Sequence, residues 1–259
     1  MLQNTRYAVK DFVRRKVSLH VGKKHFSNTK PEIFRTIEFE LRRRCNGVCP
    51  FCAASVQNEK RTDISLNEEI FYKVIKELGD INYEGRINFF INTEPLLDKR
   101  LPEFVSYARE MCPRAYLLVI TNGKSLSNQK GELLISNGLD LLELNHYSDD
   151  VGLSKNVDLF MKEVAPRYPN KVRLNRRQLT VQLNNRSGSS PNGRQLTKPL
   201  KAFCQKPFHY ITVSAEGKVG FCENDFYFEE VVGDVYKDNI VDIWNSDRYR
   251  AIRESLLSG

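Results

Sequence analysis

Short apolar runs alternate with longer amphipathic runs over residues 34–186. The first short run, 34–42 (FRTIEFELR), alternates apolar with polar residues, which predicts a strand. The next long run, 65–81, predicts a helix with an apolar face and a capping box formed by Ser65 and Glu68. Further strands are predicted at 86–94, 115–123, 139–147, 171–177 and 179–186, with helices at 100–112, 127–138 and 156–168.

This order predicts an α/β fold with a mostly parallel sheet, and six strands favour an open or partial barrel. Its working end should lie where the strands finish.

A Gly-, Ser- and Pro-rich stretch, 184–199, interrupts this pattern. Beyond it, 208–222 predicts a hairpin with its turn at Glu216 and Gly217, and 240–257 predicts a final helical segment. We therefore expect a basic extension at 1–33, a barrel at 34–186 and a small C-terminal unit at 187–259.

Composition is that of a globular protein, with 41% hydrophobic and 28% charged residues among 259. No run has the character of a signal peptide or of a membrane span, so we expect a cytoplasmic protein with no membrane partner. The net charge is +8, and much of the excess lies in residues 1–35. This leader fits a solvated extension, a strip for an acidic partner or a phosphate clamp. Nucleic acid is disfavoured as a partner because no recognised binding motif accompanies the charge.

Three cysteines, Cys45, Cys49 and Cys52, follow the first predicted strand directly. A reducing compartment disfavours disulfides, so metal or redox chemistry is the better interpretation. An iron-sulfur cubane has four iron corners held by Cys thiolates, and three ligands leave one iron open. The alternatives are buried small hydrophobes or a zinc site that lacks its fourth ligand. The adjoining Arg42, Arg43 and Arg44 could offset the cluster's negative charge.

The segment CNGVCPFC (45–52) resembles the Cys-x3-Cys-x-aromatic-Cys signature of radical S-adenosylmethionine (SAM) enzymes, with Phe51 as the aromatic residue. The resemblance implies a partial (β/α)6 TIM-like barrel and a [4Fe–4S] cluster held by the three cysteines. It implies that SAM binds the open iron through its amino and carboxylate groups. Reductive cleavage of SAM then gives a 5′-deoxyadenosyl radical, which abstracts hydrogen from a substrate.

Other strand ends support this resemblance. INTEP resembles the family's Gly-Gly-Glu-Pro segment, which holds the amino group of SAM, although both glycines are replaced. TNG (121–123) ends the third predicted strand as in many members, yet it is also an ordinary turn sequence. A histidine at a strand end is more often structural than functional. The cofactor contacts implied by the resemblance are Phe51, Asn92, Thr93, Glu94, Thr121, Asn122, Asn145 and His146.

A second cysteine pair, Cys204 and Cys222, lies in the C-terminal unit. The unit resembles the SPASM/twitch extension of radical SAM enzymes, in which two such cysteines help to hold an auxiliary [4Fe–4S] cluster. The further Cys-x-x-Cys of that extension is not present before Gly259, so we expect a truncated or incompletely ligated site, with Asp225 or His209 as conceivable substitutes. The alternative is a reduced structural pair. Cys112 is expected to be a core residue at a helix end.

EPLL, TNG, NNRSG, CENDF and DIWNSDRY (within residues 94–249) resemble segments of twitch-type dehydrogenases, which oxidise a secondary alcohol of a sugar or cyclitol to a ketone. The resemblance places Arg186 beside the substrate hydroxyl. An arginine stays protonated, so its role would be electrostatic; a structural loop arginine is the alternative. Asn224 matches a substrate-binding glutamate, and a neutral amide there favours an uncharged polyol or sugar.

Two other functional hypotheses remain. SPASM proteins also include maturases of ribosomal peptides, for which the basic leader could hold an acidic peptide. A nucleic-acid or scaffold-binding protein with a degenerate barrel is a hypothesis outside enzymology, and the intact cysteine triplet argues against it. An enzyme of this class would need an electron donor such as flavodoxin or ferredoxin.

Overall fold

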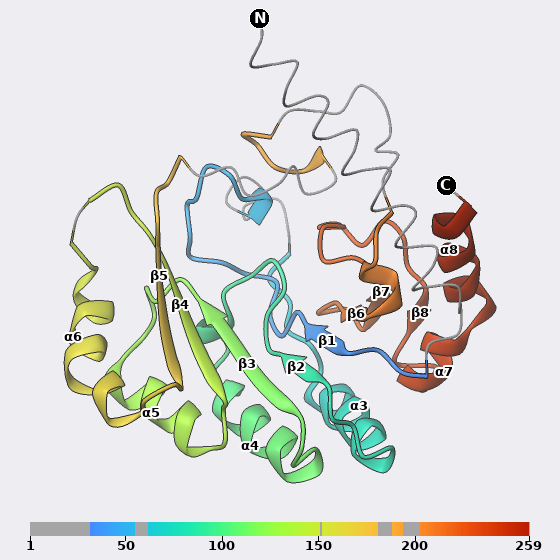
Figure 1. Ribbon diagram of the computed structural model, residues 1–259, viewed down its shortest axis with the longest axis horizontal. Coiled ribbons are helices and arrows are strands. Elements are labelled where there is room, and N and C mark those ends of the chain that lie inside the picture. Colours follow the sequence, from blue (N-terminus) through green and yellow to red (C-terminus); the bar gives the residue numbers. More distant parts are fainter. Residues whose placement is uncertain (1–31, 55–61, 151, 181–187, 194–202, 259) are drawn as a thin grey trace, which may run out of the picture.

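The computed structural model describes residues 32–54, 62–150, 152–180, 188–193 and 203–258. These residues form one eight-stranded sheet in the order β5–β4–β3–β2–β1–β6–β7–β8 (Figure 1). The strands are β1 (Thr36–Phe39), β2 (Arg86–Asn88), β3 (Tyr116–Thr121), β4 (Leu141–Tyr147), β5 (Val172–Arg177), β6 (Tyr210–Val213), β7 (Lys218–Gly220) and β8 (Gly233–Asp234).

The strands from β5 to β6 in this order are parallel to one another, while β7 and β8 add as antiparallel neighbours. The predicted α/β fold with a mostly parallel sheet is therefore confirmed. Among the described residues, the sixth parallel strand is β6, which follows the interruption in the sequence and pairs with β1. Most of the sixth strand predicted from the sequence, 179–186, lies outside the described residues.

The helices of the barrel region lie along one face of the sheet, each packed against the next (Figure 1). They are α3 (Glu68–Asp80), α4 (Leu101–Met111), α5 (Asn128–Ser136) and α6 (Lys155–Glu163), with short 3-10 turns η1 (Pro95–Leu97) and η2 (Ala165–Arg167). Each of these helices follows a strand, so the loops that join a strand to its helix lie at the carboxyl ends of the strands.

Helix α3 begins later than the sequence predicted. Its N-cap is Asn67, whose side chain accepts from the Glu69 N–H at 2.8 Å. Ser65 instead forms an isolated β-bridge with Arg42. The capping box expected from Ser65 and Glu68 is therefore wrong, because tertiary pairing holds Ser65 in extended backbone ahead of the helix.

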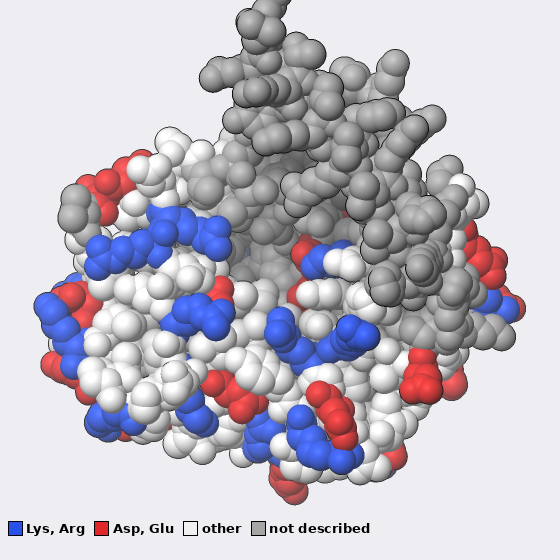
Figure 2. Space-filling model, viewed as in Figure 1, with Lys and Arg blue, Asp and Glu red and all other residues white. Residues whose placement is uncertain are grey.

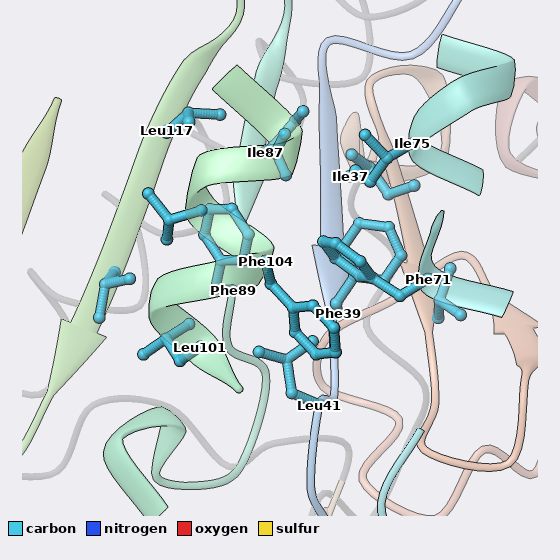
Figure 3. Close-up of a cluster of buried hydrophobic side chains, with 14 of the residues drawn as sticks. Ile37, Phe39, Leu41, Phe71, Ile75, Ile87, Phe89, Leu101, Phe104 and Leu117 are labelled. Carbon is cyan, nitrogen blue, oxygen red and sulfur yellow. The ribbon is translucent and has the colours of Figure 1, made fainter. Parts of the chain in front are cut away.

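The main core lies between the sheet and its helices (Figure 3). Ile37 and Phe39 of β1 point toward the helices, as do Ile87 of β2 and the adjacent Phe89. Phe71 of α3 stacks on Phe104 of α4 with ring centroids 4.2 Å apart. Burying each such side chain stabilises the fold by about 1.5–3 kcal/mol. Because side chains alternate along a strand, the intervening residues point to the opposite side of the sheet.

The C-terminal unit contains the predicted hairpin, in which Gly217 has a φ of +75° at the turn between β6 and β7. The segment predicted as one helical run divides into α7 (Ile240–Asn245) and α8 (Asp247–Ser258) because the backbone at Ser246 is extended. Buried Arg253 of α8 donates to the carbonyl oxygens of Trp244 and of Pro207, which lies in η4 (Lys206–Phe208).

The surface seen in Figure 2 carries basic and acidic side chains interspersed over the described elements. Within the described part of the chain, no helix is long and apolar enough to cross a bilayer.

Candidate active site at the carboxyl ends of the strands

A cavity of about 440 Å³ lies at the carboxyl ends of β1, β2, β3 and β4. It is bounded by the three-cysteine loop, by the loops that follow β2 and β3, and by the start of the C-terminal unit. Predicted site residues that line it are Cys45, Cys49, Phe51, Cys52, Asn92, Thr93, Glu94, Thr121, Asn122, Asn145 and Asn224.

The three-cysteine loop turns all of its thiols toward this cavity. The backbone of Gly47 packs closely on this loop's sulfur atoms, since a Cβ there would lie 3.2 Å from the Cys45 Sγ and 3.7 Å from the Cys49 Sγ. The Gly47 N–H donates to the Cys45 Sγ at 3.3 Å. Residues separated in the sequence by up to seven positions therefore present three sulfur atoms to one space.

Polar contacts anchor the loop to the end of β3. The amide group of Asn46 accepts from the Asn122 Nδ2 at 2.9 Å and donates to the Ser125 Oγ at 2.9 Å. Lys124 donates to the Asn46 carbonyl oxygen at 3.3 Å. The segment TNG, which could have been a simple turn, thus also positions the cysteine loop.

The electrostatic surroundings of the thiols fit an iron-sulfur cluster. Burial raises the pKa of Cys45 to about 12 and also raises that of Cys49, and charge on the neighbouring thiols acts in the same direction. Thiolates at Cys45 and Cys49 are therefore unfavourable unless a metal supplies positive charge. Three sulfur donors on one cavity wall are the donor set that such a cluster takes. Among the described residues, however, no group of three His, Cys, Asp or Glu side chains is arranged to hold a single metal ion.

Two of the arginines beside the cysteines are engaged elsewhere. Arg42 forms a fork with the Asp63 carboxylate, at 2.9 and 2.7 Å. Arg43 pairs with Glu216 at 3.0 Å and with Glu40 at 3.5 Å. Neither lines the cavity. Both arginines thus have structural partners outside the cavity, in place of the hypothesised role of offsetting the charge of the cluster. Arg43 in particular joins the cysteine loop to the hairpin turn through Glu216.

Three hydrogen bonds hold the Glu94 carboxylate in the cavity wall. Its Oε1 accepts from the Leu96 N–H at 3.0 Å and from the Thr121 Oγ1 at 2.5 Å, and its Oε2 accepts from the Asn122 N–H at 2.8 Å. Burial raises the pKa of Glu94, while these hydrogen bonds act in the opposite direction. A carboxylate can accept about four hydrogen bonds, so Glu94 retains capacity for one further donor, such as an ammonium group.

The remaining predicted cofactor contacts on this wall differ in burial and partners. Phe51 is buried, with its ring centroid 4.8 Å from that of Tyr147. Asn92 donates to the Glu223 carbonyl oxygen at 3.0 Å, which ties the loop after β2 to the C-terminal unit. Asn145 accepts from the Asn175 Nδ2 at 3.1 Å.

His146 departs from the prediction. Glu143, Asn145 and Tyr147 of β4 line the cavity, and strand alternation directs the intervening His146 to the helix-covered side. It is buried, and its Nε2 has no hydrogen-bond partner among the described residues. The structure therefore does not place His146 among the residues that line the cavity, because the prediction considered its position along the strand and not its face.

The second cysteine pair lies beside this cavity. The two thiols are near enough that charge on Cys204 raises the pKa of Cys222, although burial is the larger cause. Asp225 uses both carboxylate oxygens to accept from the Glu229 and Glu230 N–H groups. His209 lines a different cavity, at the start of β1 and β6. Asp225 and His209 stay conceivable substitutes only as predictions, and Arg186 lies outside the described residues.

The sequence analysis missed a charged cluster on the same cavity wall, formed by Glu38, Arg86, Lys206 and Glu223. Lys206 and Glu223 form an ion pair at 2.5 Å. Burial, followed by the charge on Glu223, raises the pKa of Glu38 from 4.5 to about 8. Glu38 belongs to the alternation of apolar and polar residues in 34–42, and such alternation is also typical of a solvent-facing residue, so the sequence carried no separate signal for its role.

Comparison with known proteins assigns the class. A family model described as SPASM, an iron-sulfur cluster-binding domain, matches residues 204–258. The crystal structure of BtrN in complex with AdoMet and 2-DOIA is similar, with a TM-score of 0.76 and 28% identity over 88% of this chain and 89% of that one. The fold also matches anSMEcpe with bound AdoMet, with a TM-score of 0.57 and 12% identity over 83% and 78% of the two chains. The chain is a radical SAM protein with a C-terminal SPASM domain.

Two relatives are also similar to this chain in sequence. The chain is 29% identical to the S-adenosyl-L-methionine-dependent 2-deoxy-scyllo-inosamine dehydrogenase of Niallia circulans, over 88% of this chain and 89% of that protein. It is also 31% identical to the PqqA peptide cyclase of Granulibacter bethesdensis, over 43% of this chain and 29% of that protein. The first similarity extends over nearly the whole of both chains, whereas the second is partial.

Proposed function

We propose that this protein is a SAM-dependent radical dehydrogenase that oxidises a secondary alcohol of a cyclitol or sugar to a ketone. The observation that carries the proposal is the cavity that brings the three-cysteine loop and Glu94 together with the charged cluster of Glu38, Arg86, Lys206 and Glu223. The full-length similarity to a cyclitol dehydrogenase supports this choice of substrate class.

We propose that Cys45, Cys49 and Cys52 hold the [4Fe–4S] cluster and that Cys204 and Cys222 contribute to an auxiliary cluster. When bound, these groups and SAM supply a 5′-deoxyadenosyl radical that takes a hydrogen atom from the carbinol carbon, and an acceptor for the second electron. The hydroxyl proton would pass to water, so the loss of one hydrogen atom, one electron and one proton would turn the alcohol into a ketone.

The chain's own residues bind and orient the reactants. In this proposal Glu94 accepts from the amino group of SAM, because its Oε2 has capacity for a further hydrogen bond. Phe51, Asn92, Thr93, Thr121, Asn122 and Asn145 complete the cofactor side of the cavity. Asn224 contacts the substrate, and Arg186 stabilises the developing alkoxide electrostatically.

Three features of the organisation are part of the proposal. Residues 34–186 would form the radical SAM barrel except for its sixth parallel strand, β6, and 187–259 would contain the auxiliary-cluster unit, with a basic extension at 1–33. A cytoplasmic location would keep the thiols reduced. The external electron donor would be a small redox protein such as flavodoxin or ferredoxin.

The test uses anaerobically reconstituted protein with SAM, a chemical reductant and 2-deoxy-scyllo-inosamine or scyllo-inositol carrying deuterium on its carbinol carbons. We expect deuterium to appear in 5′-deoxyadenosine together with formation of a ketone. Cys45→Ala should abolish SAM cleavage, whereas the matched control Cys112→Ala should retain it, because Cys112 is buried at the end of α4 and does not line the cavity. SAM cleavage by Cys45→Ala would refute the assignment.

A SPASM-type peptide maturase is the second candidate, favoured by the partial similarity to a peptide cyclase. It predicts radical transfer to a peptide and no oxidation of cyclitols. Mass spectrometry of the same reaction, run with a candidate precursor peptide in place of the cyclitol, separates the two functions.

A further inference from the structure

Three neighbouring strands present a row of buried polar side chains at one register. Asn88 of β2 and Thr212 of β6 are each paired with Glu38 of β1, which lies between them. Paired residues of neighbouring strands share a face of the sheet, and this face is the one that carries the cavity. The exposed fractions are 3% for Asn88, 5% for Glu38 and 0% for Thr212. Polar residues in the interior of a parallel sheet need partners.

The hydrogen bonding of this polar row is incomplete. Asn88 donates from Nδ2 to the Glu38 Oε1 at 2.8 Å. Within the described residues, however, the Asn88 Oδ1 and the Thr212 Oγ1 have no hydrogen-bond partner. A buried polar atom that is left without a hydrogen-bond partner destabilises the fold. Because Asn88 lines the cavity, a ligand there can supply the missing donor.

The charges around the row balance locally. The ammonium group of Lys206 lies 2.5 Å from the Glu223 carboxylate and 3.8 Å from the centroid of the Tyr210 ring. The positive charge of Arg86 also acts on Glu38. Burial holds Glu38 in its neutral form near pH 7, which leaves no unpaired anion in the row to attract a cation.

We propose that Asn88 and Glu38, flanked by the Lys206–Glu223 pair, form a subsite for adjacent hydroxyl groups of an uncharged polyol. A hydroxyl both donates and accepts, so one hydroxyl can donate to the Asn88 Oδ1 and its neighbour can accept from Glu38. An ammonium group could donate to Asn88, but it would meet Arg86 and Lys206 without an unpaired carboxylate. The inference rests on the proposed function, since it names the substrate class for the same cavity.

The test measures binding rather than turnover. Anaerobically reconstituted enzyme is saturated with SAM and titrated by calorimetry, without reductant, with scyllo-inositol and with 2-deoxy-scyllo-inosamine. We expect the neutral polyol to bind at least tenfold more tightly than the amine. Asn88→Leu, which keeps the volume but removes the amide, should weaken binding of scyllo-inositol by about 10–100-fold.

Two further variants serve as a control and as a second test of the subsite. Asn128→Leu is the matched control, because Asn128 also has an unpartnered amide oxygen but does not line the cavity, and its binding should equal that of the unaltered enzyme. Glu38→Gln keeps a neutral hydrogen-bonding group and should bind scyllo-inositol within about threefold.

Any of four results would overturn the proposed subsite. Two concern the variants: an unchanged affinity of Asn88→Leu for scyllo-inositol, or a tenfold loss of that affinity in Glu38→Gln. The other two concern the unaltered enzyme: tighter binding of the amine than of scyllo-inositol, or no binding of either cyclitol. The comparison of the two ligands needs no variant, so it holds even where Asn88→Leu fails to fold. Asn88-dependent binding without formation of a ketone would instead refute the proposed reaction and leave the subsite standing.

Discussion

Replacing Glu38 with glutamine should remove a pH-dependent loss of stability. The pKa of Glu38 is raised to about 8, first by burial and then by Glu223, against opposing effects of Asn88, Lys206 and Arg86. A raised pKa means that protonation of Glu38 stabilises the folded state. This contribution is complete below the ordinary pKa of 4.5 and disappears as the pH rises through 8. Glutamine stays neutral throughout and can still accept from Asn88.

The magnitude follows from the two pKa values. Linkage gives a contribution of about 3 kcal/mol at pH 6 that falls to nearly zero at pH 9. For a chain of this size, about 3 kcal/mol corresponds to a change in melting temperature of about 6–12 °C. The melting temperature of the unaltered protein should therefore fall relative to that of Glu38→Gln by this amount between pH 6 and pH 9.

The assay is anaerobic thermal unfolding of the reconstituted protein, followed by circular dichroism at several pH values. The difference between the two proteins isolates Glu38, because titration of the thiols affects both alike. Glu84→Gln removes a carboxylate that is 62% exposed and paired with Arg114, and it controls for the change in net charge. Melting temperatures of Glu38→Gln and the unaltered protein that run parallel within 2 °C would refute the reasoning.

Three further substitutions test contacts that stabilise the fold around the site and at the C-terminal helices. Thr121→Val removes the hydroxyl that donates to buried Glu94 and should lower the free energy of unfolding by about 1–3 kcal/mol in denaturant titrations, with weaker SAM binding in calorimetry. Gly123→Ala places a Cβ 2.4 Å from Val157 at a φ of +75°; a fall of more than about 1 kcal/mol in unfolding free energy is expected, and an unchanged value would contradict the packing. Arg253→Met leaves two buried carbonyl oxygens without a donor and should speed proteolysis of the C-terminal helices; unaltered cleavage would count against this anchor.

Local sequence was sufficient where neighbouring residues decide the outcome. The alternation in 34–42 and the apolar face of 65–81 gave the strand β1 and the helix α3, because side-chain periodicity follows directly from backbone geometry. The turn at Gly217 was predictable because few residues adopt a positive φ. The start of α3 was not predictable, since Ser65 is held by a β-bridge to distant Arg42.

The site divides in the same way. The spacing of Cys45, Cys49 and Cys52 pointed to cluster chemistry because one loop holds all the donors. Cys204 and Cys222 were recognisable as a second pair, and they fall within the SPASM match. Glu38 was missed as a cavity residue, and His146 was predicted at the cavity although it lies on the other side of the sheet. Both outcomes depend on which face of the sheet each residue occupies.

The sequence by itself determined the chemical class, because the three thiols, the strand ends and the hairpin are each encoded within a few residues. Only the tertiary structure decided what shares the cavity with the thiols. It pairs β6, from beyond residue 200, with β1, and so places Thr212 beside Glu38 and Asn88 and brings Lys206 and Glu223 to the same wall. Such contacts depend on strand register between segments more than 100 residues apart, which periodicity does not record.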